Sequence, residues 1–154
     1  MRRRLLGAFV AGAAALGSGF ATATPATSAP FWQAVNTDSN WSCSDYKNHR
    51  LSHNIKFKTC IVRNSSNDAQ AVLVVQNSGT KAAVIHGDIG QTLTGGAHDG
   101  FYYSASCYES TLNPGFTRGC FGSTFPGTTR ITATSELLMN GYDLDNRSTD
   151  SWYG

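Results

Sequence analysis

The chain has 154 residues, 40% of them hydrophobic and 14% charged, and its 12 basic and 10 acidic side chains give a formal net charge of +2. This length corresponds to one domain. Three of the basic residues are Arg2, Arg3 and Arg4, and no charged residue follows them before Asp38. Without these three the chain is close to neutral, which excludes the basic surface of a nucleic-acid-binding protein.

The N-terminus has the pattern of a secretory signal peptide. A positive region is followed by an apolar stretch at residues 5–16 and by a cleavage site of small residues, Ala21-Thr22-Ala23. The apolar stretch is about 12 residues long, whereas a membrane-spanning helix needs about 20. We expect residues 1–23 to be removed and the mature protein to be secreted and extracellular, without a membrane anchor. The arginines also fit a twin-arginine signal, so the sequence does not decide between the general and the twin-arginine export routes.

Four cysteines, an even number in an exported chain, predict two disulfides, for which three connectivities are possible. Their spacing favours neighbours, Cys43 with Cys60 and Cys107 with Cys120. Each pairing would contribute about 3 kcal/mol by restricting the unfolded chain. Short Cys-x-x-Cys pairs are absent, which argues against a zinc site. We also expect no other metal and no cofactor.

The first part of the mature chain differs in composition from the rest. Residues 24–40 are rich in Thr, Pro, Ser, Ala and Asn and are expected to form a flexible lead-in, which Phe31 and Trp32 could tether. A single β-rich domain is then expected over residues 41–154.

The middle of the chain shows strand patterns. Side chains alternate from Ile55 to Val62, which predicts a half-buried strand, and residues 69–76 are a β-branched apolar run typical of a central strand covered on both faces. A turn then leads into a strand at residues 81–86. Residues 87–100 contain five glycines and no clear period, so we expect them to be mostly loop.

Two later segments complete the predicted fold. Residues 101–108 alternate, and so do residues 130–139. The predicted inward sets are Phe101, Tyr103, Ala105 and Cys107 in the first segment and Ile131, Ala133, Leu137 and Met139 in the second. With turn clusters at short intervals, these patterns predict an all-β fold, a small antiparallel β-sandwich or barrel with two disulfides.

Cysteine and aromatic residues recur in a pattern across the mature chain. The segments concerned are Trp41-Ser42-Cys43, Phe57-Lys58-Thr59-Cys60, Val74-Val75-Gln76-Asn77 and Gly115-Phe116-Thr117-Arg118-Gly119-Cys120. This pattern resembles that of small exported actinomycete proteins with two cysteine pairs on a β-rich core. The resemblance implies no activity, because no catalytic residues or ligand are known for such proteins.

The sequence does not carry a strong enzyme motif. His49 and His53 have the spacing of a helical metal pair, but their neighbours favour a turn, and no serine lies in a Gly-x-Ser-x-Gly turn. Asp143 and Asp145 belong to only a partial calcium-loop pattern. A carboxylate pair for glycoside hydrolysis could still come from Glu109, Glu136 and the eight Asp residues. We expect a non-catalytic protein.

A polar and aromatic strip is the main candidate binding site. It consists of the outward residues of the 101–108 segment, namely Tyr102, Ser104, Ser106 and Tyr108. Ordinary cross-strand packing with the polar tips in water accounts for such a strip, but it could also stack on a sugar or an extended peptide. The first hypothesis is therefore a protein that binds an extracellular polysaccharide or protein surface.

A protease inhibitor is the alternative hypothesis. Residues 113–119 lie between Cys107 and Cys120 and would project as a disulfide-closed loop, presenting Phe116 or Arg118 to a specificity pocket. A rigid loop loses little entropy on binding, which suits an inhibitor. The sequence does not specify the partner or the oligomeric state.

Overall fold

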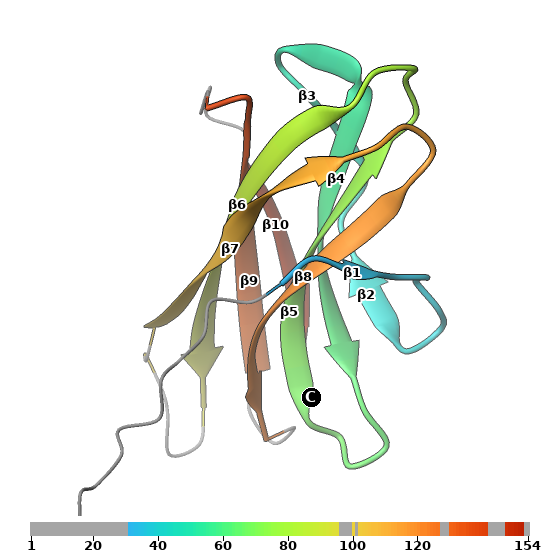
Figure 1. Cartoon of the computed structure of the whole chain (residues 1–154). Helices are drawn as coiled ribbons and strands as arrows, with labels where there is room; N and C mark the ends of the chain where they lie inside the picture. The colour runs from blue at the N-terminus through green and yellow to red at the C-terminus, as the bar shows by residue number, and fades with distance from the viewer. Residues whose placement is uncertain (1–30, 96–99, 101, 127–129, 142–146, 153–154) are drawn as a thin grey trace, which may run out of the picture.

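The computed structural model describes residues 31–95, 100, 102–126, 130–141 and 147–152, and all regular structure in these ranges is β-strand. The strands form two antiparallel sheets that pack face to face, as Figure 1 shows. The predicted all-β antiparallel fold with two disulfides is confirmed. The predicted leader lies outside the described residues. In the described ranges no helix could cross a membrane.

The first sheet, sheet A, has six strands. In spatial order they are β1 (Gln33–Ala34), β8 (Thr117–Phe125), β5 (Ala69–Asn77), β4 (Ser52–Arg63) and β2 (Trp41–Cys43), and β3 (Lys47–His49) also pairs with β4. β5 therefore lies in the middle of the sheet, as its apolar sequence predicts.

The second sheet, sheet B, has four strands. Their order is β10 (Arg147–Trp152), β9 (Arg130–Met139), β6 (Ala83–Thr94) and β7 (Tyr102–Leu112). The chain passes between the sheets after β5, β7 and β8, while β6 and β7 form a hairpin within sheet B (Figure 1).

The expectation that residues 87–100 are mostly loop is wrong for residues 87–94, which form the second half of β6. Two glycines obscure the alternation of this strand. Gly87 faces the core, where a Cβ would overlap Leu73 and lie 3.3 Å from the indole of Trp32. Glycine is therefore required here because another layer approaches the strand closely, and not because the chain turns.

The described part of the predicted lead-in, residues 31–40, contributes to the sandwich. Gln33 and Ala34 form β1 and pair with Gly119 and Arg118 of β8. Trp32 packs against the main core, and its indole N–H donates a hydrogen bond of 2.7 Å to the carbonyl oxygen of Tyr108. The chain thus joins the sheet before Trp41.

The main core lies between the two sheets. Its largest fully buried side chains include Phe57, Ile61, Leu73, Ile85, Ile89, Leu93, Leu112, Ile131 and Leu137. A smaller apolar cluster covers the outer face of sheet A, where Val72 and Val74 of β5 pack with Val35, Trp41 and Phe121. β5 is consequently buried on both faces.

Buried polar contacts join the two sheets across the core. Thr59 and Ser135 share a hydrogen bond of 2.5 Å between their hydroxyl groups. The buried amide of Gln91 makes partly buried hydrogen bonds to both backbone groups of the exposed Ser123, each at 2.9 Å. Because buried polar groups that lose a partner are costly, these contacts help to fix how the sheets align.

The two disulfides join neighbours in sequence, as predicted. Cys43 and Cys60 are paired across β2 and β4 within sheet A, whereas Cys107 of β7 and Cys120 of β8 link sheet B to sheet A inside the core. Disulfides persist in oxidising compartments, so these bridges point to an oxidising environment.

Candidate functional site

The outer face of sheet B carries an open depression of about 420 Å³, which we call the outer groove. Its lining comes from three neighbouring strands and consists of Asp88, Ile89, Gly90, Tyr102, Ser104, Ser106, Thr134, Ser135 and Glu136. β6 lies in the centre, with β7 on one side and β9 on the other.

Strand register brings the polar groups of the outer groove together. Gly90 pairs with Ser104 of β7 and Thr134 of β9. Cross-strand partners project from the same face of a sheet. Asp88 likewise pairs with Ser106 and with Glu136, so the two carboxylate residues are direct neighbours on adjacent strands.

Gly90 deepens the floor of the outer groove, because it has no side chain. A Cβ at this position would overlap the hydroxyl group of Tyr102 and lie 2.8 Å from the Thr134 hydroxyl oxygen. The Tyr102 side chain therefore lies over the glycine, yet 64% of its surface remains exposed. The result is an accessible aromatic ring beside a shallow polar floor.

The polar groups of the outer groove include both donors and acceptors. The Ser106 hydroxyl donates a hydrogen bond of 2.5 Å to Asp88 Oδ1, and His86 Nε2 lies 3.8 Å from Asp88 Oδ2. None of the described residues that line this groove is Lys or Arg. The lining thus favours neutral, hydroxyl-bearing ligands over anionic ones.

Three of the four residues in the predicted strip line the outer groove: Tyr102, Ser104 and Ser106. The fourth, Tyr108, is outside the lining, and its ring centre lies 5.2 Å from that of Phe31. Both rings are exposed, at 49% and 64%. The outer face of sheet B therefore has aromatic groups at two places along β7.

Sequence reasoning missed Asp88, Gly90, Thr134 and Glu136 as lining residues of this site. Asp88 and Gly90 fall in the segment that was expected to be loop. The sequence did contain a signal for this strand. Apolar residues recur at even-numbered intervals on both sides of the glycines, at Ile85, Ile89 and Leu93. Thr134 and Glu136 could be expected to face outward from β9, but not to lie beside β6.

The segment proposed as an inhibitor loop forms a corner between the sheets. Residues 113–116 connect β7 to β8, and Asn77 holds them by accepting from Gly115 N at 2.8 Å and donating to Phe116 O at 3.0 Å. The guanidinium of Arg118 lies 4.8 Å from the centre of the Phe116 ring. Phe116 remains 46% exposed, and the disulfide between Cys107 and Cys120 joins the strands on either side of this corner.

The predicted histidine pair is split by the β3–β4 turn. His49 is buried, and its Nδ1 accepts a hydrogen bond from Leu51 N. Nε2 therefore carries the proton and donates to Leu137 O at 3.2 Å. His53 is exposed. No group of three His, Cys, Asp or Glu residues in the described ranges could hold a metal ion, and Asp143 and Asp145 lie outside those ranges.

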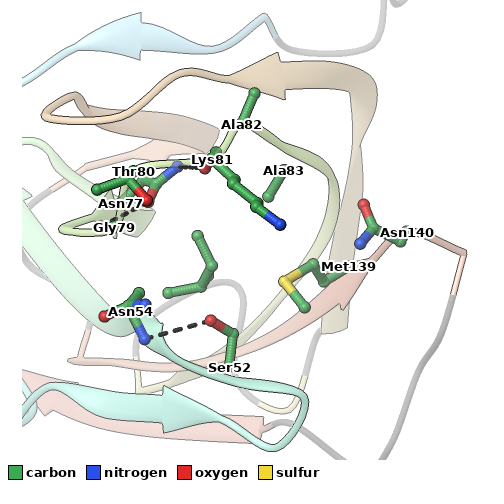
Figure 2. A pocket seen from close by; sticks show the side chains of 11 residues that line it. Ser52, Asn54, Asn77, Gly79, Thr80, Lys81, Ala82, Ala83, Met139 and Asn140 are labelled. Atoms are coloured by element: carbon green, nitrogen blue, oxygen red, sulfur yellow. Dashed lines mark hydrogen bonds between the residues drawn. The ribbon is translucent and has the colours of Figure 1, made fainter.

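A second depression, the end pocket, lies at one end of the sandwich and is shown in Figure 2. Its volume is about 370 Å³. It is lined by the start of β4, the turn between β5 and β6, and the end of β9, with Ile55, Lys81, Met139 and Asn140 among its residues. Sequence reasoning did not predict this pocket.

The outer face of sheet A carries a cation over an aromatic ring. Lys58 Nζ lies 4.7 Å from the centre of the Tyr46 ring. Burial lowers the pKa of the Lys58 ammonium group and raises the pKa of the Tyr46 phenol, because both charged forms lose hydration.

No protein-family model matches this chain, and the comparison with curated proteins finds no match either. Among solved structures, the chain is similar to a DUF4848 family protein from Bacteroides thetaiotaomicron, with 16% sequence identity and a TM-score of 0.41. The match covers 78% of this chain and 50% of the other, so this chain spans half the length of that protein.

Proposed function

We propose that this protein is an exported, non-catalytic β-sandwich that binds an extended polysaccharide in the outer groove of sheet B. The observation that carries the proposal is the accessible ring of Tyr102 beside a polar floor opened by Gly90. Sugars present C–H groups on the faces of their rings and hydroxyl groups at the edges. A ligand of this kind needs an aromatic surface and hydrogen-bonding groups close together.

The polar lining supplies those hydrogen-bonding groups. Carboxylates such as Asp88 only accept hydrogen bonds, while the hydroxyls of Ser104 and Thr134 both donate and accept. Sugar hydroxyl groups have the same dual capacity. The absence of Lys and Arg from the described lining disfavours nucleic acids and other anionic polymers.

The open shape favours a polymer over a compact metabolite. Pockets for small metabolites are concave and bury most of the ligand. Here the ligand would rest on a sheet face, with Tyr102 at one place along β7 and the Phe31–Tyr108 pair at another. An extended chain could contact both aromatic groups at once, and each contact alone would be weak.

The predicted signal peptide, residues 1–23, places this activity outside the cell. The two disulfides agree with that location, because they are stable in oxidising compartments. An extracellular binding protein of this kind would meet insoluble polymers such as chitin, cellulose or cell wall.

A sedimentation assay with chitin, cellulose and purified cell wall tests the proposal. We expect the wild type to be retained on at least one polymer and Tyr102→Ala to lose about tenfold in affinity, since a stacked ring contributes about 1–1.5 kcal/mol. Tyr46→Ala, which removes a tyrosine from the connection between β2 and β3, is the matched control and should bind normally. Retention on none of the polymers, or equal loss in both variants, would contradict the proposal. Binding to a peptide array instead would indicate a protein ligand.

A further inference from the structure

We propose that the end pocket is a separate binding site for a small carboxylate that carries an apolar group. This site shares no lining residue with the outer groove. Its volume of about 370 Å³ is near the lower end of the range for ligand pockets. The ligand must accordingly be small.

The floor of the end pocket is apolar. Ile55, Ala83 and Met139 all lie within it and expose only 3%, 7% and 6% of their surfaces. They belong to the main core, and this edge of the core forms part of the pocket lining. An aliphatic group of a ligand would extend this core and displace water from it.

The mouth of the end pocket is rich in hydrogen-bond donors. Lys81 is exposed and extends over the opening, with Asn54 and Asn140 on opposite sides in Figure 2. Asn140 Oδ1 accepts from Val84 N at 3.1 Å, which leaves the amide NH₂ of Asn140 as a donor. Ser52 Oγ likewise accepts from Asn54 N, so its hydroxyl proton is directed elsewhere.

The turn that presents Lys81 is held by Asn77. Asn77 Nδ2 donates to Lys81 O at 2.9 Å and to Leu112 O at 3.0 Å. Asn77 Oδ1 accepts from Gly79 N at 2.9 Å. The backbone beneath Lys81 is thus fixed before any ligand arrives, which limits the entropy lost on binding.

The charge at the mouth selects the ligand. Lys81 is the one ionisable residue among the described lining residues, and none of them is Asp or Glu. An anion is therefore favoured, and the apolar floor below the donors requires that the anion carry an aliphatic group. A carboxylate next to a branched apolar carbon meets both conditions, whether it is a free acid or the C-terminal residue of a peptide.

Titration of the purified protein by NMR tests this assignment. The probes are isovalerate, its neutral isostere isovaleramide, acetate, and N-acetyl-valine, which is isovalerate with the acetamido group of a peptide C-terminus. We expect isovalerate to shift the amide signals of Lys81, Ala83 and Asn140 with an affinity on the order of 1 mM. Isovaleramide and acetate should each bind at least about tenfold more weakly, because each lacks one of the two recognised groups. Tighter binding of N-acetyl-valine than of isovalerate would identify a peptide C-terminus as the source.

The matched variants are Lys81→Gln and Lys56→Gln, of which the second changes a lysine outside the pocket. Lys81→Gln should weaken isovalerate binding about tenfold with an unchanged melting temperature, and Lys56→Gln should have no effect. Equal binding of isovalerate and isovaleramide by the wild type would overturn the proposal without any variant. Unchanged binding by Lys81→Gln would overturn it too. Neither result depends on whether sheet B binds a polymer.

Discussion

The phenol group of Tyr102 lies so closely over Gly90 that a Cβ added to the glycine would overlap the tyrosine hydroxyl. The two residues are on neighbouring strands, and Gly90 has no side chain that could hold the ring away from the sheet. The accessible aromatic surface of the outer groove thus depends on the absence of a side chain on the adjacent strand.

Gly90→Ala should displace the Tyr102 ring and reduce polymer retention about as much as Tyr102→Ala does. The cost in stability should be about 1 kcal/mol, because the Tyr102 hydroxyl and the hydroxyl of the exposed Thr134 must both move away from the new Cβ, while alanine tolerates extended backbone. Sedimentation with the polymer and urea unfolding measure the two quantities. Full retention by Gly90→Ala would show that the position of the ring over the glycine is not needed.

Gln91→Leu should destabilise the fold by about 1–3 kcal/mol. Gln91 is buried, and its amide makes two partly buried hydrogen bonds to the backbone of Ser123 in the other sheet. Leucine would remove both hydrogen bonds, and each contributes about 0.5–1.5 kcal/mol. Urea unfolding measures the change.

Thr92→Ala is the control for Gln91→Leu, because Thr92 is the next residue of β6 and faces solvent. It should change the free energy of unfolding by less than about 0.5 kcal/mol. If both variants lost the same free energy of unfolding, the loss would come from a general effect on β6 and not from the Gln91–Ser123 contact.

Alternation in the sequence predicted several strands because each of them has one buried face. The segment from Ile55 to Val62 lies within β4, and residues 130–139 coincide with β9. The inward residues Ile131, Ala133, Leu137 and Met139 are all buried. For such strands a local pattern is sufficient, since burial of one face repeats every second residue.

The second half of β6 and most of the site could not be predicted in the same way. A side chain at Gly87 would collide with Leu73 and crowd Trp32. A side chain at Gly90 would collide with Tyr102. Those contacts involve residues far away in sequence, so locally the glycines resemble a loop. The pairing of Asp88 with Glu136 depends on strand order, which no short segment encodes.

Tyr46 should make the protein less stable at alkaline pH. Burial raises the pKa of its phenol in the folded state above the ordinary value of 10.0. Above pH 10 the unfolded chain releases this proton while the folded chain retains it, so stability falls as pH rises. Below pH 9 both states hold the proton and the contribution is constant.

Tyr46→Phe removes this titration. The difference in unfolding free energy between wild type and Tyr46→Phe should be constant from pH 6 to 9 and then shift in favour of the variant above about pH 10. Urea unfolding at a series of pH values measures it. A difference that stays flat up to pH 11 would mean that the phenol titrates equally in both states.

Processing of the leader should give a mature chain that begins at or near Thr24. Ala21-Thr22-Ala23 provides the small residues that signal peptidase requires, and cleavage after Ala29 would place Pro30 directly after the cut. N-terminal sequencing of protein from culture supernatant checks this. Membrane-bound protein that still carries Met1 would contradict it.

The two disulfides should differ in their contribution to stability even though they close loops of similar length. Their sequence separations are 17 and 13 residues, so restriction of the unfolded chain contributes about 3 kcal/mol in each case. Their surroundings differ. Cys107 and Cys120 are both fully buried in the main core, whereas the other bridge joins the fully buried Cys60 to Cys43, which is only partly buried against the smaller cluster on sheet A.

Cys107→Ala/Cys120→Ala should therefore cost about 4 kcal/mol, because the lost sulfur atoms add a cavity term of about 1 kcal/mol to the entropic term. Cys43→Ala/Cys60→Ala should cost about 3 kcal/mol, since neighbouring side chains and water can fill the space on the outer face. Urea unfolding of the two double variants, each with its other disulfide intact, measures the difference. A larger loss in Cys43→Ala/Cys60→Ala would show that the outer cluster, and not the bridge between the sheets, limits the stability of the sandwich.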